Sequence, residues 1–324
     1  MTKRMAELAV ALVGCGGAGS VHLTCWQNLI GVRVAAVCDT NGLLAARAVA
    51  NIDGAAAYTD VRAMLRTQPF DIIDVCTNPT QHFSVAEAAL RAGANVLCEK
   101  PLTTSVEDAR TLVRTAAERE RLLMTAFTHR FHPPLLFAKE LVDNDDLGRI
   151  TMFRCRFSGF FEGVAESGLA DAEQSGGGVL VDTAVHGIDL FRYFCGEVSE
   201  IQGRLATVTP ELKVEDTAAL LLKGENGALG VVEASWSQHG GRSVVEIYGT
   251  AGACIVEYET GIVRYMTADQ PLYQTREEGG PNRFERQIAH FADAVRGLQP
   301  LLVTGKDGLR AVELCAEVYR QNAN

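Results

Sequence analysis

The sequence lacks the features that mark membrane, nucleic-acid-binding and disulfide-stabilised proteins. None of its 324 residues lies in an apolar run of 18 or more, which a transmembrane helix needs. It has no basic stripe, and its formal net charge of −10 argues against nucleic acid as a partner. Its nine cysteines include no Cys-x-x-Cys pair, and several lie in apolar runs where cysteine acts as a small hydrophobe. The stretch before the first glycine-rich turn is too short for a signal peptide with a cleavage site. We therefore expect a cytoplasmic protein with free thiols and no membrane partner.

What is present is the composition of an ordinary globular protein. Hydrophobic residues make up 47% of the chain and charged residues 22%. The length favours two domains. The change of pattern described below places them at 1–127 and 128–324, and the C-terminal helix could pack back on the first.

A glycine-rich loop follows the first strand-like run. Residues 9–13 are continuously apolar, and a helix is predicted from about 18 to 29. Between them stands the pattern G-x-G-x-x-G, in which the first glycine permits a tight turn, the second lets a pyrophosphate approach, and the third lets helix and strand pack. Amide hydrogens at the helix start then face the phosphates. The predicted cofactor-binding residues here are Gly14, Gly16, Gly17, Ala18 and Gly19.

An acidic residue follows the next strand, 32–38. Asp39 comes 20 residues after Gly19, where a carboxylate would accept hydrogen bonds from a ribose diol and repel a 2′-phosphate. Thr40 and Asn41 follow, with no adjacent Arg or Lys. This pattern favours NAD over NADP. Asp39 could also cap a helix that starts near Asn41, a role compatible with the first.

Two further turns are predicted at the same edge of the sheet. Strands alternate with helices, which predicts parallel pairing with crossovers. The strand ends Thr77-Asn78-Pro79 and Glu99-Lys100-Pro101 therefore lie at the carboxyl edge with the glycine loop, where ligands bind in open α/β sheets. A lone lysine at such a position is usually a solvated loop residue; the glycine loop and Asp39 favour a functional role for Lys100. The strands are predicted at 71–76, 94–98 and 122–127, and the helices at 81–92 and from Ser105, which begins a capping box, through 117.

The pattern changes after about residue 130. Short strand-like runs separated by glycine-rich turns predict a mostly antiparallel sheet. These runs are 150–160, 198–208, 216–223, 228–236, 242–248, 252–257 and 261–266. Helices are predicted at 133–144, 283–296 and 306–321.

One helical segment of this half carries a carboxylate and an imidazole at i and i+4. Asp182 and His186 share a helix face after three glycines, 176–178. A carboxylate beside an imidazole fixes its tautomer and raises its basicity, as a general base requires. Such a pair is also common on exposed helices. Asp189 is either a third member or a structural hydrogen-bonding group. No second His/Cys cluster supports a metal, and we predict none.

These motifs, in this order, resemble those of the glucose-fructose oxidoreductase / inositol dehydrogenase (Gfo/Idh/MocA) family over nearly the whole chain. The matching segments are Gly14-x-Gly16-x-x-Gly19-x-x-His22, Thr77-Asn78-Pro79-x-x-His82, Glu99-Lys100-Pro101 (whose Lys–Pro bond can be cis), Arg130-Phe131 with Pro133-Pro134, Asp182-x-x-x-His186 and Tyr248-Gly249-Thr250-x-Gly252. One departure is Ala184, where many relatives carry glycine.

The resemblance implies a fold and a reaction. The fold is a Rossmann domain with a doubly wound, mostly parallel sheet, followed by an α+β domain on a large open, mostly antiparallel sheet whose outer face mediates homodimers or homotetramers. The reaction is reversible oxidation of a secondary alcohol of a sugar, inositol or related polyol by NAD(P). Neutral substrates are favoured over phosphates because the pocket regions, 158–175 and 236–239, have few cationic side chains.

The resemblance also implies roles for single residues. His186, oriented by Asp182, would remove the hydroxyl proton; Lys100 would donate a hydrogen bond to the same oxygen or act as the base itself. Further cofactor contacts would come from Thr77, Asn78, Pro79, His82, Glu99 and Lys100, and tentative substrate contacts from Arg130, Phe160 and Trp236. Two alternatives stay open: a non-catalytic NAD-binding regulator, and an NAD-dependent glycosidase on the same fold.

Overall fold

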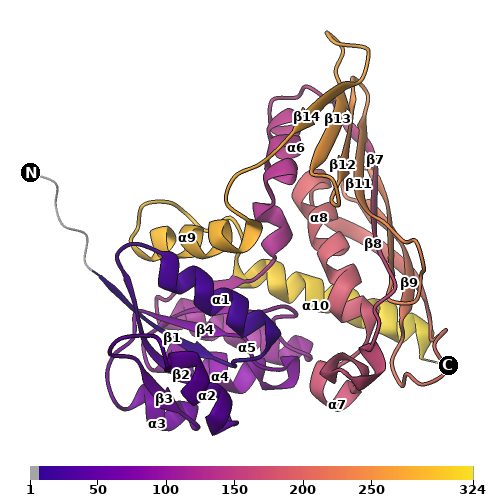
Figure 1. Ribbon diagram of the computed structural model, residues 1–324. Helices are drawn as coiled ribbons and strands as arrows, with labels where there is room; N and C mark the ends of the chain where they lie inside the picture. The colour runs from indigo at the N-terminus through magenta and orange to yellow at the C-terminus, as the bar shows by residue number, and fades with distance from the viewer. Residues whose placement is uncertain (1–6, 324) are drawn as a thin grey trace, which may run out of the picture. The chain divides into compact units, whose positions relative to one another are not determined.

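Six strands from the first part of the chain pair in parallel, in the order β3-β2-β1-β4-β5-β6 (Figure 1). Alternating helices connect them, as the sequence predicts. The strands are β1 Leu8–Val13, β2 Val32–Cys38, β3 Ala56–Tyr58, β4 Ile72–Val75, β5 Asn95–Cys98 and β6 Leu123–Thr125. The helices are α1 Gly17–Asn28, α2 Gly42–Val49, α3 Val61–Leu65, α4 Pro79–Arg91 and α5 Val106–Glu118. Ser105 caps α5 by accepting a hydrogen bond from the Asp108 amide, as its capping box predicts.

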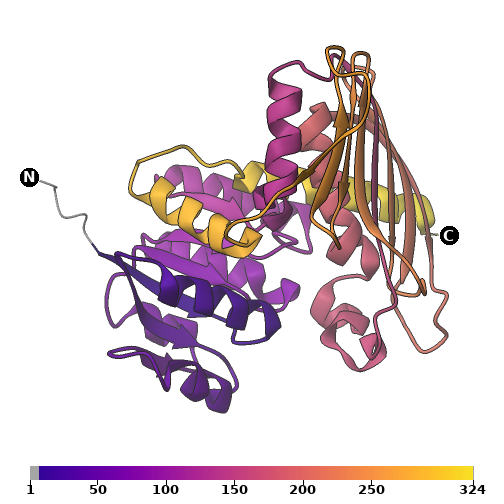
Figure 2. The ribbon, with the colours of Figure 1, turned by 45° about the horizontal axis from the view of Figure 1, so that its top comes forward.

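Eight strands form the second sheet, in the order β14-β13-β12-β11-β7-β10-β9-β8. Figure 2 shows these strands side by side. All neighbours are antiparallel except β7 and β10, which pair in parallel. The strands are β7 Ile150–Ser158, β8 Val198–Ala206, β9 Thr217–Gly224, β10 Leu229–Ser235, β11 Ser243–Gly249, β12 Ala253–Glu257, β13 Ile262–Met266 and β14 Gln274–Glu277. The mostly antiparallel sheet is confirmed, whereas β14 has no counterpart among the predicted strands.

Helices cover one face of the second sheet. α6 (Pro133–Asp143) packs on β12 and β13, and α8 (Val185–Cys195) packs on β7 and β10. A 3-10 turn, η1 (Thr128–Phe131), precedes α6, and a π-helical turn, η4 (Leu180–Ala184), leads directly into α8. The loop between β7 and η4 holds only the short turns η2 (Val164–Glu166) and η3 (Gly168–Ala170) and the short helix α7 (Ala172–Ser175). Strand residues alternate between this covered face and the outer one, as in β9, where Leu220 and Leu222 are buried but Leu221 is 59% exposed.

The computed structural model describes residues 7–323, which form two compact units. The first contains the chain up to Ala126 and Phe284–Val312; the second contains Phe127–Arg283 and the chain from Glu313 on. The first unit thus includes most of α9 (Arg283–Val295) and the start of α10 (Gly305–Asn322). The predicted division assigned 128–324 to the second domain and allowed the C-terminal helix to pack back on the first. The predicted lack of a signal peptide concerns residues that begin outside the described range. Within that range, no helix is both long and apolar enough to cross a membrane.

Candidate functional site

The glycine loop combines tight packing with open space. Gly14 has a φ of +97°, and a Cβ there would lie 2.5 Å from the carbonyl oxygen of Cys76. A Cβ on Gly19 would lie 1.9 Å from the carbonyl oxygen of Gly14, so only glycine lets α1 approach the loop. At Gly16 and Gly17, by contrast, a Cβ would meet no atom within 4 Å. Because no side chain caps the first turn of α1, its amides are available to an anion. These residues fit a pyrophosphate group.

Asp39 lies beside this loop. Its carboxylate accepts hydrogen bonds from the backbone amides of Cys15 and Asn41, each at 2.8 Å. The cap of α2 is Asn41, whose side chain accepts from the Leu43 amide, rather than Asp39 itself. The carboxylate is thereby held against the first turn of the glycine loop.

His82 of α4 connects the two other turns at this edge. It is fully buried, and its ring nitrogens lie 2.7 Å from the carbonyl oxygen of Pro101 and 3.0 Å from that of Thr77. The Lys100–Pro101 peptide bond is cis. Within the first unit, the structure therefore brings the Thr77 turn and the Lys100 turn together through one imidazole.

A buried polar cluster joins α1, β4 and the end of β5. His22 Nδ1 lies 2.9 Å from Asp74 Oδ2, and its Nε2 lies 3.2 Å from Glu99 Oε1. Trp26 donates a hydrogen bond to the same Asp74 oxygen at 2.7 Å. The other oxygen of Glu99 accepts the backbone amide of Lys100 at 3.0 Å. His22 thus ties the glycine-loop helix to the residue that precedes Lys100.

The charges of this cluster shift its pKa values. Burial alone would lower the pKa of His22, but its interactions with Cys76 and Asp74 raise it well above the usual value. Burial raises the pKa of the Cys76 thiol, which stays neutral, so Asp74 supplies the charge that holds the imidazolium. Burial alone would raise the pKa of Glu99, but the hydrogen bond and charge of His22, with Lys100, lower it.

The same cluster contains the group of described residues suited to ligate a metal. Potential ligand atoms of His22, Asp74 and Cys76 lie within 4.8 Å of one another. Cys76 Sγ lies 3.4 Å from His22 Nδ1 and 3.5 Å from Asp74 Oδ1. These contacts, with the bond from Trp26, account for the arrangement without an ion.

In the second unit, the segment with Asp182 and His186 begins at a turn that Glu215 holds in place. A Cβ on Gly178 would lie 2.0 Å from the Glu215 carbonyl oxygen, so the close approach requires glycine. Glu215 Oε1 accepts hydrogen bonds from the amides of Gly178 and Leu180 and from the Tyr319 hydroxyl at 2.7 Å. Asp182 then lies in the π-helical turn η4, a feature frequent at functional sites.

His186 lies in the first turn of α8 among aromatic rings. It is 8% exposed, and its ring centroid is 4.3 Å from that of His129 and 6.1 Å from that of Phe127. His129 Nδ1 lies 3.0 Å from the Tyr258 hydroxyl. Tyr258 also stacks on His132, whose pKa burial and Arg283 lower to about 4. His132 is therefore neutral near pH 7.

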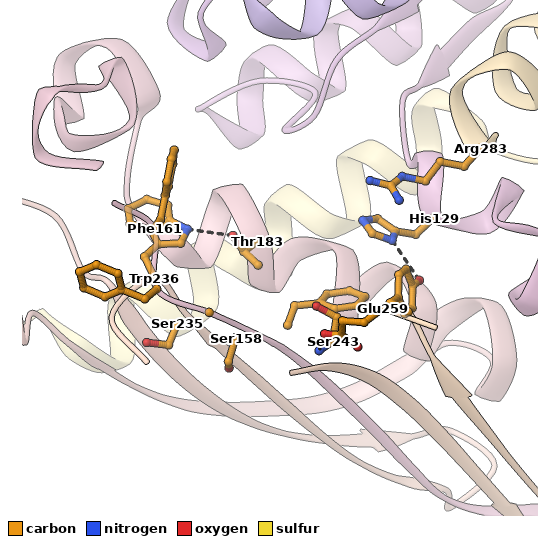
Figure 3. A pocket seen from close by; sticks show the side chains of 13 residues that line it. His129, Ser158, Phe161, Thr183, Ser235, Trp236, Ser243, Glu259 and Arg283 are labelled. Carbon is orange, nitrogen blue, oxygen red and sulfur yellow. Dashed lines mark hydrogen bonds between the residues drawn. The ribbon is translucent and has the colours of Figure 1, made fainter. Parts of the chain in front are cut away.

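A hydrogen-bond chain reaches Asp182 from the sheet. Trp236 Nε1 donates to Thr183 Oγ1 at 3.0 Å, and Thr183 Oγ1 donates to Asp182 Oδ2 at 2.9 Å. Figure 3 shows the first of these bonds.

Arg130 and Asp189 form a buried ion pair. Nε and Nη2 of Arg130 lie 2.9 and 2.6 Å from the two carboxylate oxygens of Asp189, and both residues are at most 6% exposed. The guanidinium also lies over the Tyr193 ring, 5.1 Å from its centroid. These contacts hold η1 to α8. The substrate contact predicted for Arg130 stays a prediction.

A pocket of about 560 Å³ lies within the second unit (Figure 3). Its volume is within the range typical of small-molecule sites. Phe160 and Trp236, which are predicted to contact the substrate, are among its lining residues, and Arg130 is not. Asp182 and His186 are not among its lining residues, but Thr183 and His129, which contact them, are.

Sequence reasoning did not single out several of these residues. Thr183 stands next to Asp182, and His129 next to Arg130, so adjacency to a motif was the available signal. Tyr258, Glu259 and Arg283 also line the pocket, yet no local pattern marks them. Only the tertiary structure brings these three residues to the pocket.

Replacement of His22 tests the buried ion pairs. Because the pKa of His22 is higher in the folded protein than in the unfolded one, protonation of His22 stabilises the fold. This stability is fully present below about pH 6.5 and decreases by about 1.4 kcal/mol per pH unit as the pH rises toward the folded pKa. In His22→Gln, this slope should disappear, and unfolding at pH 6 should need about 3–5 kcal/mol less free energy. Urea unfolding between pH 6 and 9 measures both. Asp74→Asn, which removes the neighbouring charge, should also flatten the slope; parallel curves for all three proteins would contradict the assignment.

Known proteins match this chain over both units. Residues 8–127 match the model of the oxidoreductase family with an NAD-binding Rossmann fold, and 135–255 match the GFO/IDH/MocA C-terminal domain. A D-apiose dehydrogenase of Rhizobium rhizogenes is 28% identical over 340 residues, covering 99% of this chain and 96% of its own. A levoglucosan dehydrogenase of Pseudarthrobacter phenanthrenivorans is 28% identical over 292 residues, covering 79% and 75%.

The fold recurs in solved structures. Levoglucosan dehydrogenase in complex with NADH and L-sorbose superposes with a TM-score of 0.91 at 24% identity, covering 98% of this chain and 97% of that one. At this identity the match establishes a shared fold. Together with the family models, it shows that the chain belongs to the GFO/IDH/MocA oxidoreductases with an NAD-binding Rossmann domain.

Proposed function

We propose that this protein oxidises a secondary alcohol of a neutral sugar, inositol or related polyol, reversibly, with NAD as the hydride acceptor. The observation that carries the proposal is the pocket of the second unit, whose lining residues Thr183 and His129 contact Asp182 and His186. Relatives named for apiose and levoglucosan support a sugar as the substrate class.

The lining of the pocket suits a neutral polyol. Aromatic rings such as Phe160 and Trp236 offer faces for the C–H groups of a sugar. Among the lining residues Arg283 is the cationic side chain and Glu259 the acidic one, so the lining has no surplus of positive charge. A phosphate group would require such a surplus.

In the proposed mechanism, the proton of the substrate hydroxyl passes to His186. A hydride leaves the carbon that carries this hydroxyl. Asp182 orients the imidazole and stabilises its protonated form. Lys100 stabilises developing charge on the substrate oxygen by hydrogen bonding or shares the proton transfer. NAD, when bound, would supply the hydride acceptor. The glycine loop would hold the pyrophosphate and Asp39 the adenosine ribose; Thr77, Asn78, Pro79, His82 and Glu99 would form the turns beside them.

Substitution of either proton-handling residue tests the reaction. Lys100→Ala and His186→Ala should each lower kcat by about 10²-fold or more, because each removes a group that acts in the transition state. The assay follows absorbance of NADH over a panel of polyols and aldoses. Lys213→Ala, at an exposed lysine, is the control and should keep wild-type turnover. Full activity of both site variants would refute the roles, and failure of every free polyol to yield NADH would favour a regulator or a glycosidase.

Substitution of Asp39 tests the choice of cofactor. A carboxylate that accepts hydrogen bonds from a ribose diol contributes about 1.5–3 kcal/mol, so Asp39→Ala should lower kcat/KM for NAD about 10- to 100-fold. Loss of the negative charge should raise kcat/KM for NADP. Asp60→Ala, which removes a carboxylate that caps α3, serves as the matched control. An unchanged NAD/NADP ratio in Asp39→Ala would contradict the proposed contact.

We further propose that copies of the chain associate through the outer face of the second sheet. Apolar Leu221 and Val231 pair across β9 and β10 on this face. Next to them, Arg156 and Glu233 form an ion pair at 3.0 Å. A surface that carries apolar groups and both signs of charge can meet its own copy across a two-fold axis.

A cytoplasmic location, supported by nine cysteines that are all free, also stays a proposal, to be tested by cell fractionation.

Leu221→Asp tests this interface. Since Leu221 is 59% exposed, the change should leave the fold intact but place a charge in the contact and reduce the particle mass toward that of one chain. Light scattering coupled to size exclusion measures the mass. Leu43→Asp, on the 71% exposed Leu43 of α2, should leave it unchanged. A wild-type monomer, or a Leu221→Asp protein of wild-type mass, would exclude this interface.

A further inference from the structure

We propose that Thr183 determines substrate specificity: its hydroxyl offers the pocket an acceptor only, so the substrate must present a hydrogen-bond donor to it. This inference rests on the proposed function, and it names the chemical character of one substrate position. That position is a free hydroxyl or amine rather than a carbonyl, carboxylate, ether or phosphate oxygen.

The direction of the hydrogen bond from the indole is fixed. Trp236 Nε1 has a proton and no lone pair, so it can only donate to Thr183 Oγ1, 3.0 Å away. Trp236 is 6% exposed, which leaves little access for water to replace this bond. Thr183 Oγ1 is therefore an acceptor toward the indole.

The hydroxyl proton of Thr183 has a second fixed destination. Asp182 Oδ2 lies 2.9 Å from Thr183 Oγ1, and an ionised carboxylate can only accept. The proton thus points to Asp182, and rotation toward the pocket would break this bond and leave Asp182 without it. The chain Trp236–Thr183–Asp182 has one polarity.

One lone pair of the hydroxyl remains for the pocket. A hydroxyl oxygen has two lone pairs, of which the indole uses one. Thr183 and Trp236 both line the pocket, and Figure 3 shows their side chains joined there. A substrate oxygen without a proton would place its own lone pair against the lone pair of Thr183 Oγ1. The two acceptors could not form a hydrogen bond, and both would remain unpaired. Sites that bind a substrate hydroxyl reject analogues that lack it far more strongly than sites that discriminate by size.

The experiment uses the full-length protein with NAD and the best polyol of the panel. Analogues of that polyol carry a deoxy, deoxyfluoro or O-methyl group at one position at a time, away from the oxidised carbon. Fluorine is close to a hydroxyl in size but cannot donate. At one position, kcat/KM should therefore fall about 10- to 100-fold for both the deoxy and the fluoro analogue.

Three variants assign that position to Thr183. Thr183→Val should abolish the preference for hydroxyl over fluorine at that position and leave it at the others; Thr183→Ser should retain it. Thr183→Ala, which removes the hydroxyl together with the methyl group, should also abolish it. Phe160→Leu, at a lining residue without hydrogen-bonding atoms, should keep the wild-type ratio.

The outcomes separate this inference from the proposed function. If a polyol reduces NAD but the hydroxyl/fluoro ratio is unchanged in Thr183→Val and Thr183→Ala, the specificity role is wrong and the dehydrogenase proposal stands. If no polyol reduces NAD in the wild-type protein, both fail. The ratio is measured within one protein, so a loss of stability that lowers all rates equally does not affect it. Thr183→Ala decides the question by itself if Thr183→Val does not fold.

Discussion

A buried imidazole held between two carboxylates is the interaction on which the first unit depends. His22 comes from the helix that the glycine loop begins, Asp74 from β4, and Glu99 from the end of β5 beside Lys100. Both His22 and Asp74 are fully buried, so removal of either partner would leave an uncompensated charge in a low-dielectric interior. The cluster thus makes the geometry of the glycine loop and of the Glu99-Lys100 turn interdependent.

The second unit uses hydrogen bonds of fixed direction where the first uses buried charge. Three donors converge on one oxygen of Glu215 and hold the turn from which the π-helical segment starts. Trp236 and Thr183 then hold Asp182 from the sheet side. Such networks are strong only when every member is satisfied, which is why they also specify what a substrate can present to them. In the proposed reaction, the groups that support the base and those that select the substrate are therefore the same.

The sequence was most informative at turns and helix ends, where glycine, proline and capping residues are favoured. Glycine, proline and capping residues placed the strand ends near Asp39, Thr77 and Lys100 to within a residue or two, because backbone constraints act locally. Short elements such as β3, α3 and β14 bury few residues and carry little pattern, so prediction missed them. The parallel pairing of β7 with β10 joins strands that β8 and β9 separate in the sequence, and no local signal encodes it.

The sequence by itself determined the fold class, the nucleotide-binding loop, the acid that favours NAD, and the candidate residues Lys100, Asp182 and His186. These follow from spacing along the chain and from the resemblance that the spacing supports. Only the tertiary structure decided that His22 bridges Asp74 and Glu99, that Arg130 is paired with Asp189, and that the Thr183 hydroxyl has one direction. His22, Arg130 and Thr183 each have a partner about 50 residues or more away in the sequence, and these meetings depend on how sheets and helices pack rather than on any local pattern.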